Sequence, residues 1–438
     1  MFSPMPPNRC LASTPTAAIA ALFAALLALG ICGRALAANA TDYPPPKPAF
    51  PGQTHAPAPH TASTFTVEVL LDRVLSNPWS LAFLPDGELL VSELYGTMRT
   101  IGAGGVISAP ISGVPGVKVI EGNGLHDITL DPQFAHNRWL YFTYFAPPPG
   151  EEPAIWPSAP KAGTLAERRS KPLGFERLAR ARLSADNRHL EDFQILLEGL
   201  ERRVLFAPDG TLFIAGADRY RLYDSTEGGP DHEINDPDIL RNLTGRIARI
   251  EPDGTMPADN PFLAEATVLP ETWSYGHRDP EGIAINPATG MLWLDEHGPM
   301  GGDEINIVRA GANYGWPNVS YGRQYTGAPV ARTAAAREGQ TARAGTEQPV
   351  YYWYPDVAPS GMMFYTGDLF PDWKGNVFLG SLADKCLIRL VLDGDRVVAE
   401  EHLLGDRKQR VRDVRQGPEG AVYVLTDEGS LLRLKPRT

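Results

Sequence analysis

Short runs of apolar and β-branched residues, each closed by a tight polar turn, follow one another from Thr64 to the end of the chain. Little helical periodicity interrupts this pattern. Six related turns of the Pro-Asp-Gly kind lie between two such runs, and they begin at Pro85, Pro132, Pro208, Pro287, Pro371 and Pro418. Turn residues between β-branched and aromatic runs predict β-hairpins.

The run before each turn also recurs, as WSLAF, LHDITL, RRVLF, EGIAI, GMMFY and RDVRQ. Radial repetition of small antiparallel sheets is typical of a β-propeller. We therefore predict an all-β, six-bladed β-propeller over residues 64–438, with its first strands around a central channel. A β-sandwich is the alternative, and six units spread along the whole domain disfavour it. Uneven spacing of the units predicts inserted loops, most clearly at 146–175 and 322–346.

The first residues of the chain differ from the rest. Arg9 precedes the apolar run Ala17–Cys32, and the stretch ALAANA offers A-x-A cleavage sites. This pattern predicts a secretory signal peptide over residues 1–40 and a periplasmic or secreted protein, with an uncleaved membrane anchor as the alternative. Residues 41–63, rich in Pro and Ala, predict an extended tether.

Charge and cysteine content limit the partners. Forty basic against 52 acidic residues give a net charge of −12. Without basic clusters this argues against nucleic acid and against an anionic membrane surface, and membrane contact is expected only if the N-terminal segment stays uncleaved. Cys10 and Cys32 lie in the predicted signal. The remaining Cys386 lies in the apolar run CLIRLVL, where a buried core residue is more common than a nucleophile.

The stretch WLDEHGPMGGDEINIVRAGANYGWP, residues 293–317, contains four carboxylates, one histidine and five glycines. Its glycines and proline exclude a helix through the acidic part, and they let a backbone approach a ligand closely. Carboxylate and carbonyl oxygens are calcium ligands. On this stretch alone, a calcium-binding turn and a solvated acidic loop both stay open.

Arginines stand at the start of two predicted inner strands. Arg278 follows His277 in GHRDPEG, and Arg410 and Arg412 belong to RVRDVRQ. At channel-lining positions they indicate an anionic ligand, with salt bridges to neighbouring acids as the alternative.

Together, GHRDPEG, DEHGPMGGDEIN, GANYGWP, APSGMMFYTGD, RVRDVRQGPEGAVYVLTDE and NPWSLAFLPDG resemble the soluble PQQ-dependent sugar dehydrogenases, the glucose/sorbosone or aldose sugar dehydrogenase family. The resemblance covers roughly residues 65–434. It implies a six-bladed propeller that oxidises the C1 hydroxyl of an aldose to the lactone. Calcium-bound pyrroloquinoline quinone (PQQ) would sit in the channel mouth, and a soluble or respiratory acceptor would take the electrons.

The resemblance also assigns residues. The carbonyls of Gly298 and Pro299 match positions that hold the calcium under the quinone, and the Glu304 and Tyr314 region matches a second, structural calcium site. The positions assigned to the cofactor are Arg278, Asp279, His297, Arg410 and Arg412.

Four positions depart from the family pattern. The histidine that serves as general base falls at Gly199, a Gln at Gly122, an Asn at Asp279 and a Lys at Ala383. His126 follows Gly122 by four residues on an inner strand and therefore faces the same side. It is the candidate substitute base, with a hydrogen-bonded channel histidine as the alternative.

Three functions stay open from the sequence. The first is an exported PQQ-dependent sugar dehydrogenase with an altered base. The second is a redox-inactive, calcium-stabilised propeller that binds a carbohydrate or another small ligand. The third is a metal-dependent lactonase, which needs several side chains to converge on one metal. The sequence leaves open which of Asp127, Asp279, Glu296 and His297 converge.

Overall fold

A computed structural model describes residues 45–60, 63–120, 122–155, 174–200, 202–218, 245–323, 330 and 340–437. The chain divides into two compact units, Met1–Pro45 and Pro46–Thr438. The predicted signal peptide lies outside the described residues. Within the described ranges, no helix is both long and apolar enough to cross a membrane.

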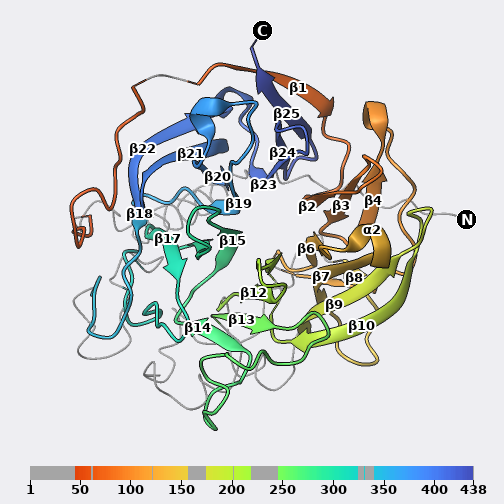
Figure 1. Ribbon diagram of the computed structural model, residues 1–438, viewed down its shortest axis with the longest axis horizontal. Coiled ribbons are helices and arrows are strands. Elements are labelled where there is room, and N and C mark those ends of the chain that lie inside the picture. Colours follow the sequence, from red (N-terminus) through yellow and green to blue (C-terminus); the bar gives the residue numbers. More distant parts are fainter. Residues whose placement is uncertain are drawn as a thin grey trace, which may run out of the picture. The chain divides into compact units, whose positions relative to one another are not determined.

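The second unit is a six-bladed β-propeller, as the repeats predicted (Figure 1). One sheet has the order β2(Pro78–Phe83)-β3(Leu89–Glu93)-β4(Thr97–Ile101). The next is β6(Leu125–Leu130)-β7(Trp139–Ala146)-β9(Phe175–Leu183)-β10(Leu190–Glu198), and the third is β11(Val204–Phe206)-β12(Leu212–Gly216)-β13(Arg246–Ile250)-β14(Thr272–Tyr275). The other blades are β15(Pro280–Ile285)-β16(Leu292–Glu296)-β17(Asp303–Val308)-β18(Tyr351–Trp353) and β19(Pro359–Phe364)-β20(Val377–Ser381)-β21(Cys386–Asp393)-β22(Arg396–Leu403).

The last blade closes the ring with the beginning of the described chain. Its order is β23(Val411–Gln416)-β24(Val422–Thr426)-β25(Leu431–Pro436)-β1(Phe65–Leu71), so that β1 pairs antiparallel with β25. This closure was not part of the sequence prediction, because β1 precedes the first repeat. Outside the blades, β5(Lys118–Val119) pairs with β8(Ala154–Ile155), and α2(Phe134–Asn137) is a short helix.

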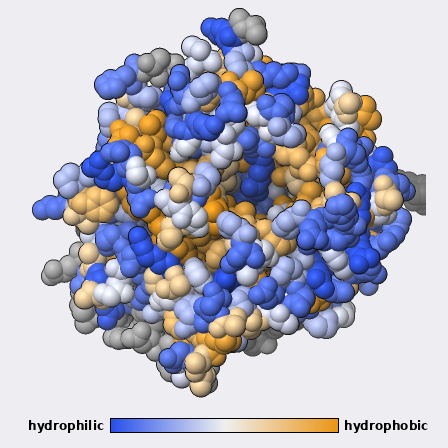
Figure 2. Space-filling model, in the orientation of Figure 1, coloured by the Kyte–Doolittle hydropathy of each residue, from blue (hydrophilic) through white to orange (hydrophobic). Residues whose placement is uncertain are grey.

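Hydrogen bonds join the first strands of neighbouring blades. The Ser80 hydroxyl donates to Asp127, and the same Asp127 accepts from the Val204 amide. The Arg203 guanidinium donates to the Glu281 carbonyl. The first strands of the blades therefore lie side by side around the centre. Figure 2 shows a hollow near the middle of the ring, with hydrophilic side chains in it.

Apolar side chains fill the space between blades rather than one central core. The six clusters of buried hydrophobic residues each draw members from two neighbouring sheets. Trp293 of β16, for example, packs with Phe364 of β19 at 5.4 Å between ring centroids. Because side chains alternate between the two faces of a strand, each blade contributes one face to each neighbour.

The segment predicted as a tether packs on the propeller from Pro46 onward. Gln53 is fully buried, and its side-chain amide donates to the Pro349 carbonyl. The Glu400 amide donates to the Pro57 carbonyl. An extended, proline-rich segment has few backbone hydrogen bonds of its own, and here the outer strands of two blades supply partners.

The inserted loops fall where the spacing predicted. Residues 146–175 connect β7 to β9, and 322–346 precede β18. A third connection, between β12 and β13, was not predicted. Large parts of all three, residues 156–173, 219–244, 324–329 and 331–339, lie outside the described residues.

Candidate functional site

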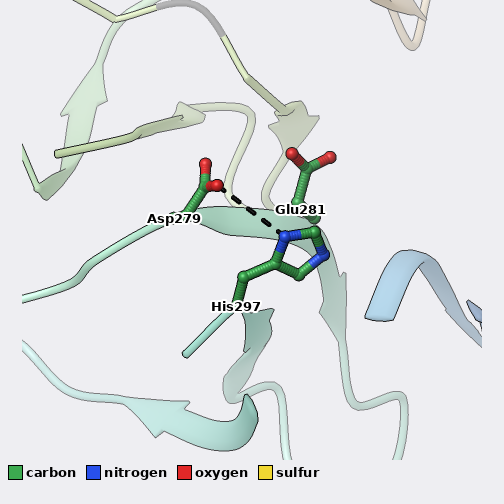
Figure 3. Close-up of side chains that lie close together, drawn as sticks. All are labelled: Asp279, Glu281 and His297. Atoms are coloured by element: carbon green, nitrogen blue, oxygen red, sulfur yellow. Dashed lines mark ion pairs between the residues drawn. The ribbon is translucent and has the colours of Figure 1, made fainter. Parts of the chain in front are cut away.

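Three metal-ligating side chains converge at the end of the fourth blade (Figure 3). Asp279 immediately precedes β15, Glu281 lies within it, and His297 follows β16. One ligand atom from each lies within 4.8 Å of the others. The β15–β16 ladder has an irregularity between Pro280 and Gly282, and such a bulge re-aims side chains at the end of a hairpin.

His297 is held in one orientation by a neighbouring blade. Its Nε2 lies 2.7 Å from the carbonyl oxygen of Pro359. A carbonyl only accepts hydrogen bonds, so Nε2 carries the proton, and in the neutral ring the lone pair is on Nδ1. This Nδ1 faces Asp279 Oδ2 at 3.7 Å.

Arg202 lies beside two carboxylates of this site, Asp279 and Glu281. We call these three residues the floor of the site. The Arg202 side chain is almost fully buried, with Nε 3.5 Å from Asp279 Oδ1 and 3.9 Å from Glu281 Oε1. Burial alone favours the neutral form of Glu281. The charges of Arg202, His297 and Arg412 nevertheless hold the pKa of this carboxyl below its usual value. The sequence analysis missed Arg202, and its only signal was a pair of arginines at the start of an inner strand.

The three predicted arginines join the same network. Arg278 Nη1 donates to the carbonyls of His297 and Gly298, both at 2.8 Å. Arg412 lies 3.3 Å from Glu281 and 2.7 Å from Asp427. Arg410 pairs with the same Asp427 at 2.8 Å. All five residues assigned to the cofactor therefore lie in one connected network, which we call the channel-end network.

The loop after β16 is fixed by Asp303. This carboxylate accepts from the backbone amides of Gly298, Val357 and Ala358, at 2.8, 2.8 and 2.7 Å. Pro299 packs against Gly322, where an added Cβ would lie 2.7 Å from its Cδ. The two backbone carbonyls assigned to calcium therefore belong to a tightly held loop.

The predicted second calcium region centres on Glu296. Asn306 donates to both Glu296 and Glu304, at 2.9 and 3.2 Å, and burial together with the Glu296 charge raises the pKa of Glu304 well above its usual value. The Tyr314 hydroxyl donates to the Ile307 carbonyl, and its ring stacks on His277. Glu304 and Tyr314 are thus linked through neighbours of Glu296, and their assignment to calcium stays a prediction.

His126 lies beneath the network. Its ring is fully buried and tilted by 37° against that of Trp79, with 4.7 Å between the ring centroids, and Nε2 donates to the Gly122 carbonyl at 3.1 Å. Arg202 Nη1 is 3.4 Å from the same nitrogen. A general base must reach the hydroxyl proton of its substrate. The role of His126 as base stays a prediction.

The structure shows which of the four candidate metal-binding residues converge. Asp279 and His297 converge, joined by Glu281. Asp127 instead faces Arg203 and Arg415 on other inner strands. Glu296 accepts from the Arg278 amide and faces His277.

The arginines of the channel-end network offer hydrogen-bond donors to an anionic ligand such as PQQ, which carries three carboxylates. Among the described residues, Arg202, Arg410 and Arg412 meet the carboxylates of Asp279, Glu281 and Asp427. The Arg278 guanidinium donates to the backbone carbonyls of His297 and Gly298. Arg410 is also well exposed, with 42% of its side chain accessible. An accessible arginine in this network fits an anionic ligand.

Comparisons with known proteins identify relatives over most of the chain. The family model described as Glucose / Sorbosone dehydrogenase matches residues 75–433. The aldose sugar dehydrogenase YliI of Escherichia coli K12 is 40% identical over 387 residues, covering 86% of this chain and 94% of that protein. An uncharacterised protein of Synechocystis is 37% identical over 388 residues, covering 82% of this chain and 84% of that protein.

Solved structures share the fold. The soluble aldose sugar dehydrogenase of E. coli in the apo form superposes with a TM-score of 0.70 at 38% identity, over 85% of this chain and 100% of that chain. The PQQ-bound aldose sugar dehydrogenase of Streptomyces coelicolor gives a TM-score of 0.61 at 24% identity, over 87% and 99% of the two chains. The family match spans most of the propeller, and we conclude that this chain belongs to the glucose/sorbosone dehydrogenase family.

Proposed function

We propose that this chain is an exported enzyme that oxidises the C1 hydroxyl of an aldose to the lactone at the channel-end network, with calcium-bound PQQ as its cofactor. The observation that carries the proposal is the convergence of all five residues assigned to the cofactor. Membership of a family whose named relatives include an aldose sugar dehydrogenase supports the substrate class.

The chain's own residues would bind and orient the cofactor. Arg410 and Arg412 would hold its carboxylates, and Arg278 would join them by turning away from the carbonyls of His297 and Gly298. The carbonyls of Gly298 and Pro299 would then hold the calcium. Bound PQQ would supply the hydride acceptor, and His126, the candidate base, would take the hydroxyl proton. Asp303 keeps the Gly298 loop in place through three backbone hydrogen bonds.

Arg202 has a specific part in this scheme. Asp279 and Glu281 would repel an anionic cofactor if they were uncompensated, because like charges at ~4 Å cost roughly 4 kcal/mol at an effective dielectric near 20. Arg202 lies beside both carboxylates and offsets part of this repulsion. It supplies a cation to a pocket in which Ala383 stands at the position of the family's lysine.

The test is a titration of the full chain with PQQ, followed by quenching of tryptophan fluorescence, with calcium and then with a chelator. We expect calcium-dependent binding and oxidation of aldoses with a dye as acceptor. Arg278→Met should weaken PQQ binding at least tenfold, whereas Arg396→Met, an exposed arginine paired with Asp393, should leave it unchanged. Absence of PQQ binding at high micromolar concentration would refute the proposal.

A second candidate is a metal-dependent lactonase, favoured by the convergence of Asp279, Glu281 and His297. Two carboxylates and an imidazole suit a divalent transition metal such as Mn²⁺ or Zn²⁺. Such a metal polarises an ester carbonyl and activates water, and so needs no histidine at Gly199.

The two candidates separate in one further assay. Protein treated with a chelator is supplied with Mn²⁺ or Zn²⁺, and both metal stoichiometry and hydrolysis of a sugar lactone are measured. Asp279→Asn and Glu281→Gln should then abolish metal binding and hydrolysis together. If wild-type protein neither binds PQQ nor hydrolyses the lactone, the redox-inactive, ligand-binding propeller is what stands.

A further inference from the structure

A nucleophile and a histidine meet on the outer strands of the fifth blade, away from the channel-end network. Cys386 begins β21, and His402 lies near the end of β22, where it pairs with Ile388. Cys386 Sγ and His402 Nδ1 are 3.6 Å apart, within hydrogen-bonding distance for sulfur. Cys386 is buried, as the sequence predicted, but one side of its thiol faces an imidazole.

A carboxylate fixes the other side of the imidazole. His402 Nε2 lies 2.6 Å from Glu400 Oε1. Glu400 is itself held, because Tyr351 and Trp353 donate to its oxygens at 2.6 and 3.1 Å. A thiol, an imidazole and an orienting carboxylate in a row form the arrangement that activates nucleophiles.

The surroundings favour a protonated imidazole. The hydrogen bond to Cys386, followed by that to Glu400, raises the pKa of His402 to about 10, against the opposing effect of burial. Asp384 adds a carboxylate 3.8 Å from Nδ1. A neighbouring imidazolium stabilises a thiolate, which is the reactive form of cysteine.

A cleft opens beside this group. It has a volume of about 340 Å³ and is lined by Thr54, His55, Tyr351, Asp356, Glu400 and His402, among others. Thr54 Oγ1 and Asp356 Oδ1 are buried in it and have no hydrogen-bond partner in the described structure. Buried polar atoms of this kind are normally satisfied, so the cleft suits a small polar molecule.

We propose that Cys386, His402 and Glu400 form a reactive-thiol site for small polar oxidants, of which hydrogen peroxide is the simplest. Cys386 is buried and does not line the cleft, so the oxidant would reach the sulfur past His402 and Glu400, which do. The sugar oxidation proposed above uses none of these residues. The sulfur attacks one peroxide oxygen, an S–O bond forms and the O–O bond breaks. The leaving hydroxide takes the proton from His402 Nδ1 and departs as water. The thiol is oxidised to sulfenic acid, the peroxide is reduced, and a thiol reductant restores the cysteine.

Other ionisable groups near His402 also contribute to the pH dependence of this site. They are the Cys386 thiol, the carboxyls of Asp384 and Glu400, and, around the cleft, His55, Tyr351, Tyr354 and Asp356. The pH dependence of thiol reactivity must therefore be compared between variants.

The experiment measures modification of Cys386 in the full chain. Peptide-resolved mass spectrometry separates it from Cys10 and Cys32, with dimedone to trap sulfenic acid and iodoacetamide to report thiolate. We expect wild-type Cys386 to react at pH 7 at least tenfold faster than in His402→Gln, which retains a polar side chain without the charge. The variant's rate should rise only near pH 8.5, where an ordinary thiol titrates. Cys386→Ser is the blank.

Equal rates in wild type and His402→Gln would overturn the proposal, as would a wild-type rate that rises only above pH 8. Circular dichroism and urea midpoints first establish that the variant folds. If it does not, the wild-type pH profile decides alone, because a reactive thiolate already present at pH 7 requires the neighbouring cation.

Discussion

Arg202 and Asp279 form a buried ion pair at the end of the channel. Nε and Oδ1 are 3.5 Å apart, and only 1% and 2% of the two side chains are exposed. Glu281 shares the same guanidinium at 3.9 Å. One cation therefore lies beside two carboxylates that water hardly reaches, and its removal takes away much of their compensation.

Arg202→Met should be strongly destabilising. Breaking a buried pair by removing one partner costs about 3–5 kcal/mol, because an uncompensated charge stays behind. Urea unfolding measures this loss. Arg396→Met, in which the lost pair with Asp393 is exposed, should cost less than about 1 kcal/mol.

A triple variant gives the internal control. Adding Asp279→Asn and Glu281→Gln to Arg202→Met removes the uncompensated carboxylates and should recover most of the lost stability. If Arg202→Met costs no more than Arg396→Met, Arg202 is not the group that stabilises the floor.

Asp303→Ala should release the loop that carries Gly298. The carboxylate holds three backbone amides, of Gly298, Val357 and Ala358. Leaving buried donors unsatisfied costs about 1–3 kcal/mol for each group, and hydrogen exchange at these amides should accelerate together. Asp253→Ala is the control, because Asp253 accepts only within an exposed turn, from Thr255. Unchanged exchange at Gly298 would contradict this role of Asp303.

The propeller was predictable because its signals are local. Turn residues between two β-rich runs specify a hairpin, and six hairpins in series specify the architecture. The closure of the ring could not be predicted, because β1 pairs with β25, which lies almost the whole chain away in sequence. The role of Arg202 could not be predicted for the same reason, since its partners Asp279 and Glu281 lie on another blade.

The Cys386–His402 contact could not be predicted by counting residues back from the hairpin turn, because the strand pairing has one irregularity. Asp393 pairs with Arg396 at the turn of this hairpin. Regular pairing from that point would place Glu401 opposite Ile388. The register shifts between Val391 and Leu392, so that His402 takes this position. A one-residue shift in register moves the side chains of a strand to the opposite face of the sheet. No pattern in this part of the sequence predicts the shift.

Gly282→Ala should disturb the floor without changing its charge. An added Cβ would lie 2.3 Å from Asp295 Oδ2 and 2.9 Å from Met362 Cβ, so buried atoms must move. Overpacking of this kind costs about 1–3 kcal/mol. Gly405→Ala is the matched control, because nothing lies within 4 Å of its added Cβ. Equal urea midpoints for the two variants would contradict the prediction, because they would mean that the surrounding atoms accommodate the added Cβ at no cost in stability.

The stability of the protein should fall as the pH rises through the range in which His402 loses its proton. Its folded pKa is raised to about 10, above the usual value of 6.5, by Cys386 and then Glu400. The folded state therefore binds the proton more tightly than the unfolded chain. The resulting stabilisation is complete below pH 6.5 and is lost progressively towards pH 10. Other groups titrate in the same window, so the informative quantity is the difference between wild type and His402→Gln. Urea midpoints from pH 6 to pH 10 should converge for the two proteins as the pH rises. Parallel curves would mean that the imidazole gains no proton affinity on folding.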